Sequence, residues 1–145
     1  MARSAQSYAT HRRYFPLFHY VALPILLANI VVTVAHAIRQ PSPFNGWMVI
    51  VSLGLVAGLV ASRASSLLVQ NRVIALEMRL RLATTLPAEL RSRIPELHLF
   101  HLVGLRFAGD GELVELVERC LRGELPNADA VKRSVRDWRP DYIRA

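Results

Sequence analysis

The 145-residue chain has little of what enzymes use for chemistry. It contains one cysteine, Cys120, which excludes an internal disulfide and agrees with a reducing compartment. Lysine is nearly absent too, because Lys132 is the only lysine among the 18 basic residues. The chain has neither a glycine-rich phosphate loop nor a nucleophile motif. The sequence therefore predicts no enzyme activity and no cofactor.

Long apolar runs, by contrast, hold most of the hydrophobic residues, which make up 52% of the chain. Phe15 to Ile38 and Trp47 to Val69 are nearly free of charge, and each is about as long as the ~20 residues that cross a bilayer as a helix. The alternative is a pair of buried helices in a soluble protein, but residues 70–145 are too polar to cover them. We expect a transmembrane hairpin over residues 14–69, after a flexible segment at residues 1–13.

The distribution of arginine predicts the orientation of this hairpin. The net charge is +7, and the short loop between the apolar runs holds only Arg39. The other arginines near the runs lie before the first run or at and beyond the end of the second: Arg3, Arg12, Arg13, Arg63, Arg72, Arg79 and Arg81. Because basic residues stay on the cytoplasmic side, both termini are expected in the cytoplasm.

Five residues are candidate anchors at the two membrane interfaces. Tyr14 lies at the inner boundary and Trp47 at the outer one, as aromatic belts require. His19 and His36 are 17 residues apart, about 26 Å along a helix, so each is expected as a solvated imidazole near an interface. Arg63 lies about 24 Å beyond Trp47, where its long side chain can reach the cytoplasmic headgroups.

Helix contacts inside the membrane are predicted from a polar residue and a row of small ones. Asn29 falls near the midplane, where its amide needs a hydrogen bond from a neighbouring helix. Gly54, Gly58, Ser62 and Ser66 follow one another at every fourth position. Such a row, called here the small-residue stripe, lets another helix approach closely. The simpler interpretation is that the stripe packs the two spans together; the other is that it faces a second protein.

The second span is expected to continue as one helix into the cytoplasm, because no helix breaker occurs between Leu67 and Leu86. Two apolar rows recur at helical spacing in this stretch. They are Val69, Val73, Leu76, Leu80 and Ala83, and beside them Ile74, Met78 and Leu82. Glu77 and Arg81 form a favourable i,i+4 pair. So wide an apolar arc must pack on the C-terminal segment, on another copy or on a partner, with Leu76 and Leu80 in the contact surface.

Residues 70–145 are expected to form a small cytoplasmic domain without strands. Four short helices are predicted over residues 87–94, 95–108, 112–123 and 128–138. Asp110 is the expected cap of the third helix and Asn127 of the fourth, whose inner face would carry Val131, Val135 and Trp138. The fold class is thus all-α: a two-helix transmembrane hairpin whose second helix continues into a small bundle.

Two clusters in this domain are candidates for binding. Glu96, His98 and His101 are the nearest approach to a metal site, but amphipathic packing explains them better, because no further ligands accompany them. The segment 132–144 interleaves basic residues with aromatic ones, including Arg136, Trp138 and Tyr142. Contact with anionic lipid or solvent is favoured for this segment over a protein partner, and nucleic acid is the least favoured.

Four stretches carry a resemblance to a known family: FPLFHYVALP from Phe15, VQNRVIALEMRLRL from Val69, LRFAGDGELVELV from Leu105 and VRDWRPDYIR from Val135. The chain resembles an uncharacterised family of small bacterial two-pass membrane proteins with a helical cytoplasmic tail. The resemblance implies a place in the bacterial inner membrane, and it implies no activity, cofactor or catalytic residue.

Together these features predict a non-enzymatic accessory or scaffold subunit of a larger membrane complex, such as a respiratory, photosynthetic or transport complex. Its expected partners are membrane lipids and either a membrane protein or a second copy. The alternative is a small homo-oligomeric channel or transporter-like protein that uses Asn29, His19 and His36. A third hypothesis, a histidine-metal enzyme, requires Glu96, His98 and His101 to hold a metal.

Overall fold

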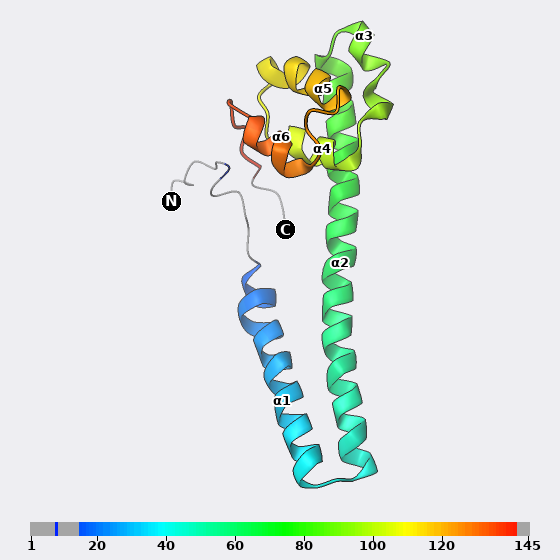
Figure 1. The fold of residues 1–145 in the computed structure, drawn as a ribbon, viewed down its shortest axis with the longest axis vertical. Coiled ribbons are helices and arrows are strands. Elements are labelled where there is room, and N and C mark those ends of the chain that lie inside the picture. The colour runs from blue at the N-terminus through cyan, green and yellow to red at the C-terminus, as the bar shows by residue number, and fades with distance from the viewer. Residues whose placement is uncertain (1–7, 9–14, 142–145) are drawn as a thin grey trace. The chain divides into compact units, whose positions relative to one another are not determined.

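The structure, a computed structural model, describes Tyr8 and residues 15–141. This part of the chain is all-helical (Figure 1), which confirms the all-α part of the prediction. The predictions for residues 1–13 other than Tyr8, and for Tyr14 and Tyr142, lie outside it. The elements in chain order are η1 (Leu17–Ala22), α1 (Leu23–Arg39), α2 (Pro43–Thr85), α3 (Ala88–Arg91), η2 (Ile94–Glu96), α4 (Leu99–Leu105), η3 (Asp110–Glu112), α5 (Leu113–Leu121) and α6 (Ala128–Ser134). The chain divides into two compact units between Leu67 and Leu68, with Tyr8 in the second.

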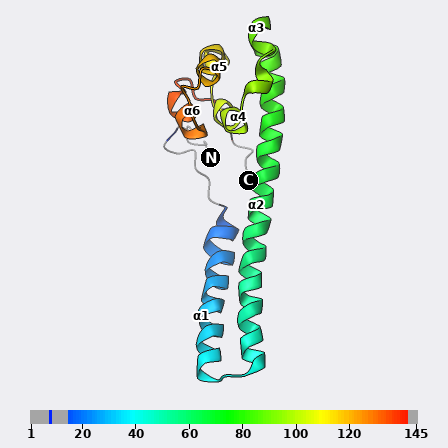
Figure 2. The same cartoon turned by 45° about the vertical axis from the view of Figure 1, so that its right-hand side comes forward.

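The first unit is a hairpin of α1 and the N-terminal part of α2, which lie side by side in both views (Figures 1 and 2). The helix begins as a π-helix, η1, and becomes α-helical at Leu23, where Pro24 occupies the first turn. Proline lacks an N–H and crowds the carbonyl of the preceding turn, which accounts for the looser π geometry before it. A π-helix there was not predicted from the sequence.

The connection between α1 and α2 is tight and closed by side chains. The side chain of Asn45 donates to the carbonyl of Gln40 at 2.6 Å, and Ser42 Oγ accepts from the backbone N–H of Asn45 at 3.1 Å. Pro43 begins α2, as suits a residue without an N–H in a first helical turn. The helix therefore starts four residues before Trp47, the predicted beginning of the second span.

α2 runs without a break for 43 residues, as the absence of a breaker in residues 67–86 predicts. At 1.5 Å per residue it is about 65 Å long, roughly twice the ~30 Å hydrocarbon thickness of a bilayer. In the described part of the chain, two helices are long and apolar enough to cross a membrane: Leu17–Arg39, with 23 residues, and α2 itself.

The second unit packs α4, α5 and α6 against the C-terminal part of α2 (Figure 2). Its core is built by the rows that the apolar spacing predicts. Buried side chains are Ile74, Met78 and Leu82 of α2, Leu86 directly after it, Leu102 and Leu105 of α4, Leu113, Leu116, Val117 and Cys120 of α5, and Val131 of α6. The predicted cap at Asn127 is confirmed, because its side chain accepts from Ala130 N at 2.9 Å.

The last helix ends earlier than the sequence suggested. α6 stops at Ser134, and Trp138 lies beyond it in an isolated antiparallel bridge to Ala108. Gly109 N donates to Asp137 O at 2.9 Å, and Arg139 N donates to Phe107 O at 2.7 Å. These two bonds require extended backbone, so helical geometry over residues 135–138 is lost.

The predicted helices over residues 87–94 and 95–108 are likewise shorter than expected. The first is a single α-helical turn, α3, followed by a 3₁₀ turn, η2, which contains Pro95. Only Leu99–Leu105 of the second is α-helical. Short elements of this kind form around the core of the second unit because their apolar residues, such as Ile94 and Leu97, are buried in it.

Candidate interaction surfaces

The contact between α1 and α2 is built around Asn29. Its Nδ2 donates to Ser52 Oγ at 2.8 Å, and Ser52 is only 1% exposed. Thr33 Oγ1 lies 3.3 Å from the same hydroxyl, and Ser52 in turn donates to the carbonyl of Met48 at 2.8 Å. The amide of Asn29 thus has a hydrogen-bond partner on the neighbouring helix.

Sequence reasoning missed Ser52 and Thr33 as members of this cluster. A signal was present, because Asn29 lies ten residues before the end of α1 at Arg39 and Ser52 lies nine residues after the start of α2 at Pro43. In an antiparallel hairpin, residues equally far from the loop lie at the same height, so a polar residue in each helix at matching distance predicts a pair.

The two glycines of the small-residue stripe face away from α1. Gly54, Gly58, Ser62 and Ser66 are all exposed, and a Cβ built on Gly54 or Gly58 would meet nothing within 4 Å. Ser52 and Gly54 are two residues apart, about 200° around a helix, and Gly58 is about 240° from Ser52, so both glycines point away from the α1 contact. Gly54 and Gly58 therefore do not pack α2 against α1, contrary to the simpler interpretation of the stripe.

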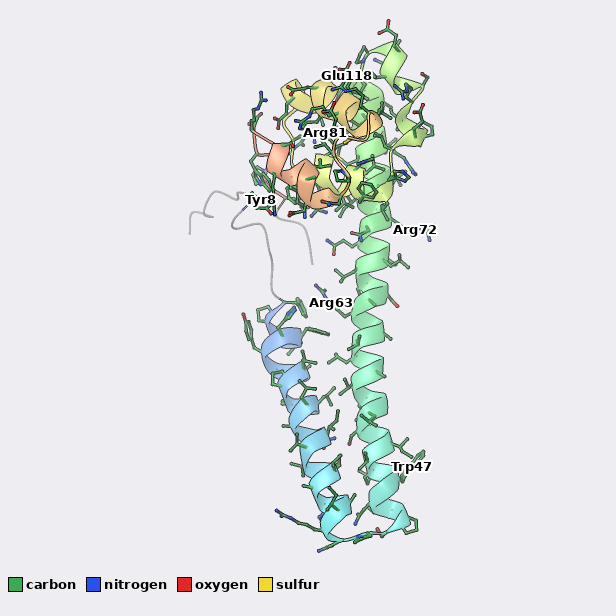
Figure 3. The ribbon with its side chains drawn as sticks, viewed as in Figure 1. Tyr8, Trp47, Arg63, Arg72, Arg81 and Glu118 are labelled. Carbon is green, nitrogen blue, oxygen red and sulfur yellow. The ribbon has the colours of Figure 1, made fainter. Side chains whose placement is uncertain are left out.

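The candidate interface residues lie at both ends of the hairpin. Arg63 is half-buried, with its guanidinium 5.9 Å from the centre of the Phe18 ring, a cation–π contact between α2 and η1 (Figure 3). His19 Nδ1 accepts from the backbone N–H of Phe15 at 3.1 Å. His36 and Trp47 are both exposed, on α1 near its end and on α2 near its start.

In the second unit, one of the two apolar rows of α2 is buried and the other is exposed. Ile74, Met78 and Leu82 are buried in the core. The other row, called here the outer row, consists of Val69, Val73, Leu76 and Leu80, which are between 49% and 62% exposed. The C-terminal helices therefore cover only one side of the apolar arc, and Leu76 and Leu80 lie on the uncovered side.

Arg81 does not pair with Glu77 as its spacing suggests. Its guanidinium reaches the loop after α4, where Nη2 donates to the carbonyl of Ala108 at 2.7 Å and forms an ion pair with Asp110 at 2.6 Å. Asp110 is therefore not the cap of the helix that follows it. The predictions of a Glu77–Arg81 pair and of a cap at Asp110 are both wrong. The N-cap position of α5 is Glu112, and its carboxylate accepts from the backbone N–H of Arg136 at 3.0 Å.

The Glu96, His98 and His101 cluster is structural. His101 is buried, its Nε2 lies 3.1 Å from Leu125 O, and its Nδ1 accepts from His98 N at 3.2 Å. Burial lowers the pKa of His101, so a neutral ring that donates through Nε2 fits both contacts. The carboxylate of Glu96 pairs with Arg93 at 2.8 Å. Within the described residues no group of three or more His, Cys, Asp or Glu side chains could hold a metal ion.

Cys120 has no features of a nucleophile. It is buried, and this burial raises the pKa of its thiol to about 11, against the lowering effect of the neighbouring Arg119. A thiol with such a pKa stays protonated at neutral pH, whereas the thiolate is the reactive form.

The basic C-terminal segment uses its tryptophan for packing. The Trp138 ring stacks on Phe107 with ring centres 4.6 Å apart, and the Arg106 guanidinium lies 4.4 Å from the centre of the Phe107 ring. The side chain of Arg136 is 80% exposed, with a long contact of 3.7 Å to Glu115. Of the predicted contact surface in this segment, Arg136 faces solvent and Trp138 is half-buried.

Comparisons with known proteins give one match. A family model described as "Family of unknown function (DUF6526)" matches residues 1–145, the whole chain. No curated protein and no solved structure matches the chain.

Proposed function

Since the chain belongs to this family of unknown function, we propose its role from the geometry: a non-enzymatic integral membrane protein that acts as an accessory or scaffold subunit. In this proposal α1 and the N-terminal part of α2 cross the inner membrane of a bacterium as a hairpin, with both termini in the cytoplasm. The hairpin docks on a helix of another membrane protein through the small-residue stripe. The observation that carries the proposal is that Gly54 and Gly58 of the stripe face away from α1.

Membrane insertion is supported by how little of the apolar helices the chain itself covers. In the most apolar 18-residue windows of the two candidate helices, 0% and 6% of the residues are buried, whereas a core helix of a soluble protein is mostly buried. On α1, Val31, Val32 and Ile38 are each at least 65% exposed. A continuous apolar surface of this kind is unfavourable in water and favourable in lipid.

Small residues on a helix face in lipid require an explanation. Glycine weakens a helix relative to alanine by roughly 0.5–1 kcal/mol, and lipid tails gain nothing from the missing side chains at Gly54 and Gly58. Another helix does gain, because its backbone can come close and pack well. The hairpin itself does not use these two glycines, since Asn29 and Ser52 join α1 to the other side of α2.

The channel or transporter alternative has less support. Asn29 would have to line a pore, but its amide is bonded to Ser52 within the hairpin. The Nδ1 atom of His19 is in contact with the backbone of Phe15. The metal-enzyme hypothesis has no support either, because His101 uses both ring nitrogens in the fold.

The proposal is tested by purifying the tagged full chain from native membranes in mild detergent, with copurifying proteins identified by mass spectrometry. Gly58→Leu fills the stripe, and Ala57→Leu is the matched control, because Ala57 is also exposed and lies at the same depth about 100° around the helix. We expect a stoichiometric membrane partner with the wild type and with Ala57→Leu, and its loss with Gly58→Leu. A wild-type chain that purifies with no other protein contradicts the scaffold role.

A further inference from the structure

The outer row of α2 is uncovered although the core of the second unit is complete. The neighbouring apolar row of α2, which consists of Ile74, Met78 and Leu82, is at most 6% exposed, so the C-terminal helices already cover that side. Val69, Leu76 and Leu80 are each about 60% exposed. The described helices of this unit leave a strip of apolar side chains open along one helix.

The spacing of this strip is that of a two-stranded coiled coil. Val69, Val73, Leu76, Leu80 and Ala83 are separated by four, three, four and three residues. This alternation places Val73 and Leu80 at heptad position a, and Val69, Leu76 and Ala83 at position d. A β-branched residue at a with leucine at d, as in Val73 and Leu76, favours two strands over three or four.

The charges beside the strip fit a second copy of the same helix. Arg72 occupies position g and Glu77 the following position e. In a parallel pair, a residue at g lies opposite the residue at e five positions later in the other chain, so Arg72 meets Glu77 twice by symmetry. An antiparallel pair would instead bring g to g and e to e, which sets arginine against arginine.

Both charged residues are available for this contact. Arg72 and Glu77 are exposed, and neither forms an ion pair with any other residue of the described part of the chain. Arg81, the intrahelical candidate for Glu77, forms its ion pair with Asp110. The charge pattern and the apolar strip therefore both indicate contact with a second copy of the same helix.

We propose that residues 69–83 of α2 form a parallel coiled coil with a second copy of this chain, so that the protein is a homodimer outside the membrane-spanning segments. The parallel direction also follows from the proposed function, because two copies inserted with the same topology run the same way. A contact of about two heptads is marginal for free helices, but anchoring both chains in one membrane raises their effective concentration.

Disulfide cross-linking of the full chain in native membranes tests the contact directly. Leu76→Cys places a thiol at a central d position, and Glu118→Cys places one on the exposed surface of α5 as the control. With a mild oxidant we expect a covalent dimer from Leu76→Cys and little from Glu118→Cys. The native Cys120 gives no background because it is buried. Equal cross-linking of the two variants, or none at Leu76→Cys, overturns the proposal.

Charge reversal tests the register and direction. Arg72→Glu alone and Glu77→Arg alone each set like charges together, and we expect copurification of two differently tagged copies to fall at least about fivefold. Coexpression of one variant with the other, or the double variant, restores opposite charges and should restore pairing. Since residues 72 and 77 do not face each other within one helix, restoration reports on contact between chains. If all combinations pair equally, the register is wrong.

The two proposals fail separately. If alkaline extraction releases the chain from membranes while charge reversal still controls pairing, membrane insertion is wrong and the dimer stands. If the chain resists extraction and Gly58→Leu loses its partner, but Leu76→Cys gives no dimer, only the coiled coil is wrong.

Discussion

Asn29 Nδ2 donates to Ser52 Oγ at 2.8 Å, and this single bond identifies the face of α2 that lies against α1. Because Ser52 and Gly54 point to opposite sides of the helix, the same bond leaves the glycines of the small-residue stripe open. One polar contact therefore separates the surface that closes the hairpin from the surface available to a partner.

Loss of this bond should weaken the hairpin. Ser52→Ala leaves the amide of Asn29 without its acceptor, so we expect the free energy of unfolding in detergent to fall by about 1 kcal/mol. Asn29→Leu together with Ser52→Ala should cost less than the sum of the two single changes. A double-mutant cycle by thermal or denaturant unfolding measures the coupling. Ser66→Ala, an exposed serine of the stripe, is the control; an equal effect there would contradict the assignment.

Gly104 should not tolerate a side chain. A Cβ at this position would lie 2.6 Å from Val131 Cβ, because α4 lies close against α6 there. We expect Gly104→Ala to lower the stability of the second unit by about 1–3 kcal/mol through overpacking. Limited proteolysis and thermal unfolding of the full chain measure this. Gly111→Ala, where a Cβ meets nothing within 4 Å, should change stability little.

Arg81 should matter more than its intrahelical neighbour. Its side chain is 16% exposed and holds the carbonyl of Ala108 and the carboxylate of Asp110. Arg81→Gln removes both charge-assisted contacts, and we expect a loss of about 1–3 kcal/mol in unfolding experiments. Glu77→Ala is the control, since the helical spacing alone would make it the partner. A larger loss for Glu77→Ala would show that the pair predicted from the sequence is the real one.

Acid should destabilise the second unit through His101. Its pKa in the folded chain lies below the ordinary value of 6.5 because burial disfavours the charged ring. The unfolded chain therefore binds the proton more readily, and stability falls as the pH drops below about 6.5 until the folded form is also protonated. Melting temperatures at pH 7.5 and 5.5 should differ less in His101→Gln than in the wild type. The same pH dependence in His101→Gln as in the wild type would contradict this role of His101.

Cys120 should react with thiol reagents only when the fold opens. With a pKa of about 11 and a buried position, the thiol is protonated and covered at pH 7.5. We expect negligible maleimide labelling of the native chain and complete labelling in denaturant. Glu118→Cys provides an exposed thiol for comparison, and rapid native labelling of the wild type would contradict the burial of Cys120.

Local pattern was enough to predict much of the fold. The apolar runs gave two long helices, the missing breaker gave an uninterrupted α2, and Asn127 supplied its cap from its own side chain. These features depend on residues within one or two helical turns of each other, so the order of residues along the chain is sufficient. For the same reason, the inner faces of α5 and α6 were readable from the positions of Leu113, Leu116 and Val131.

Other features depended on residues far apart in the chain. Periodicity shows that α2 has a wide apolar arc, but it cannot show which part of that arc is covered. The exposure of the stripe and of the outer row was therefore known only from the structure. Arg81 pairs with Asp110, 29 residues away, and not with Glu77. Helix α6 ends early because the backbone of residues 137 and 139 forms hydrogen bonds with the chain beyond α4. The sequence by itself determined which segments are helical, because helix formation depends on residues close together in the chain. Tertiary structure decided which helix faces and charges stay exposed, because each long-range contact covers a surface or pairs a charge that the sequence pattern leaves open.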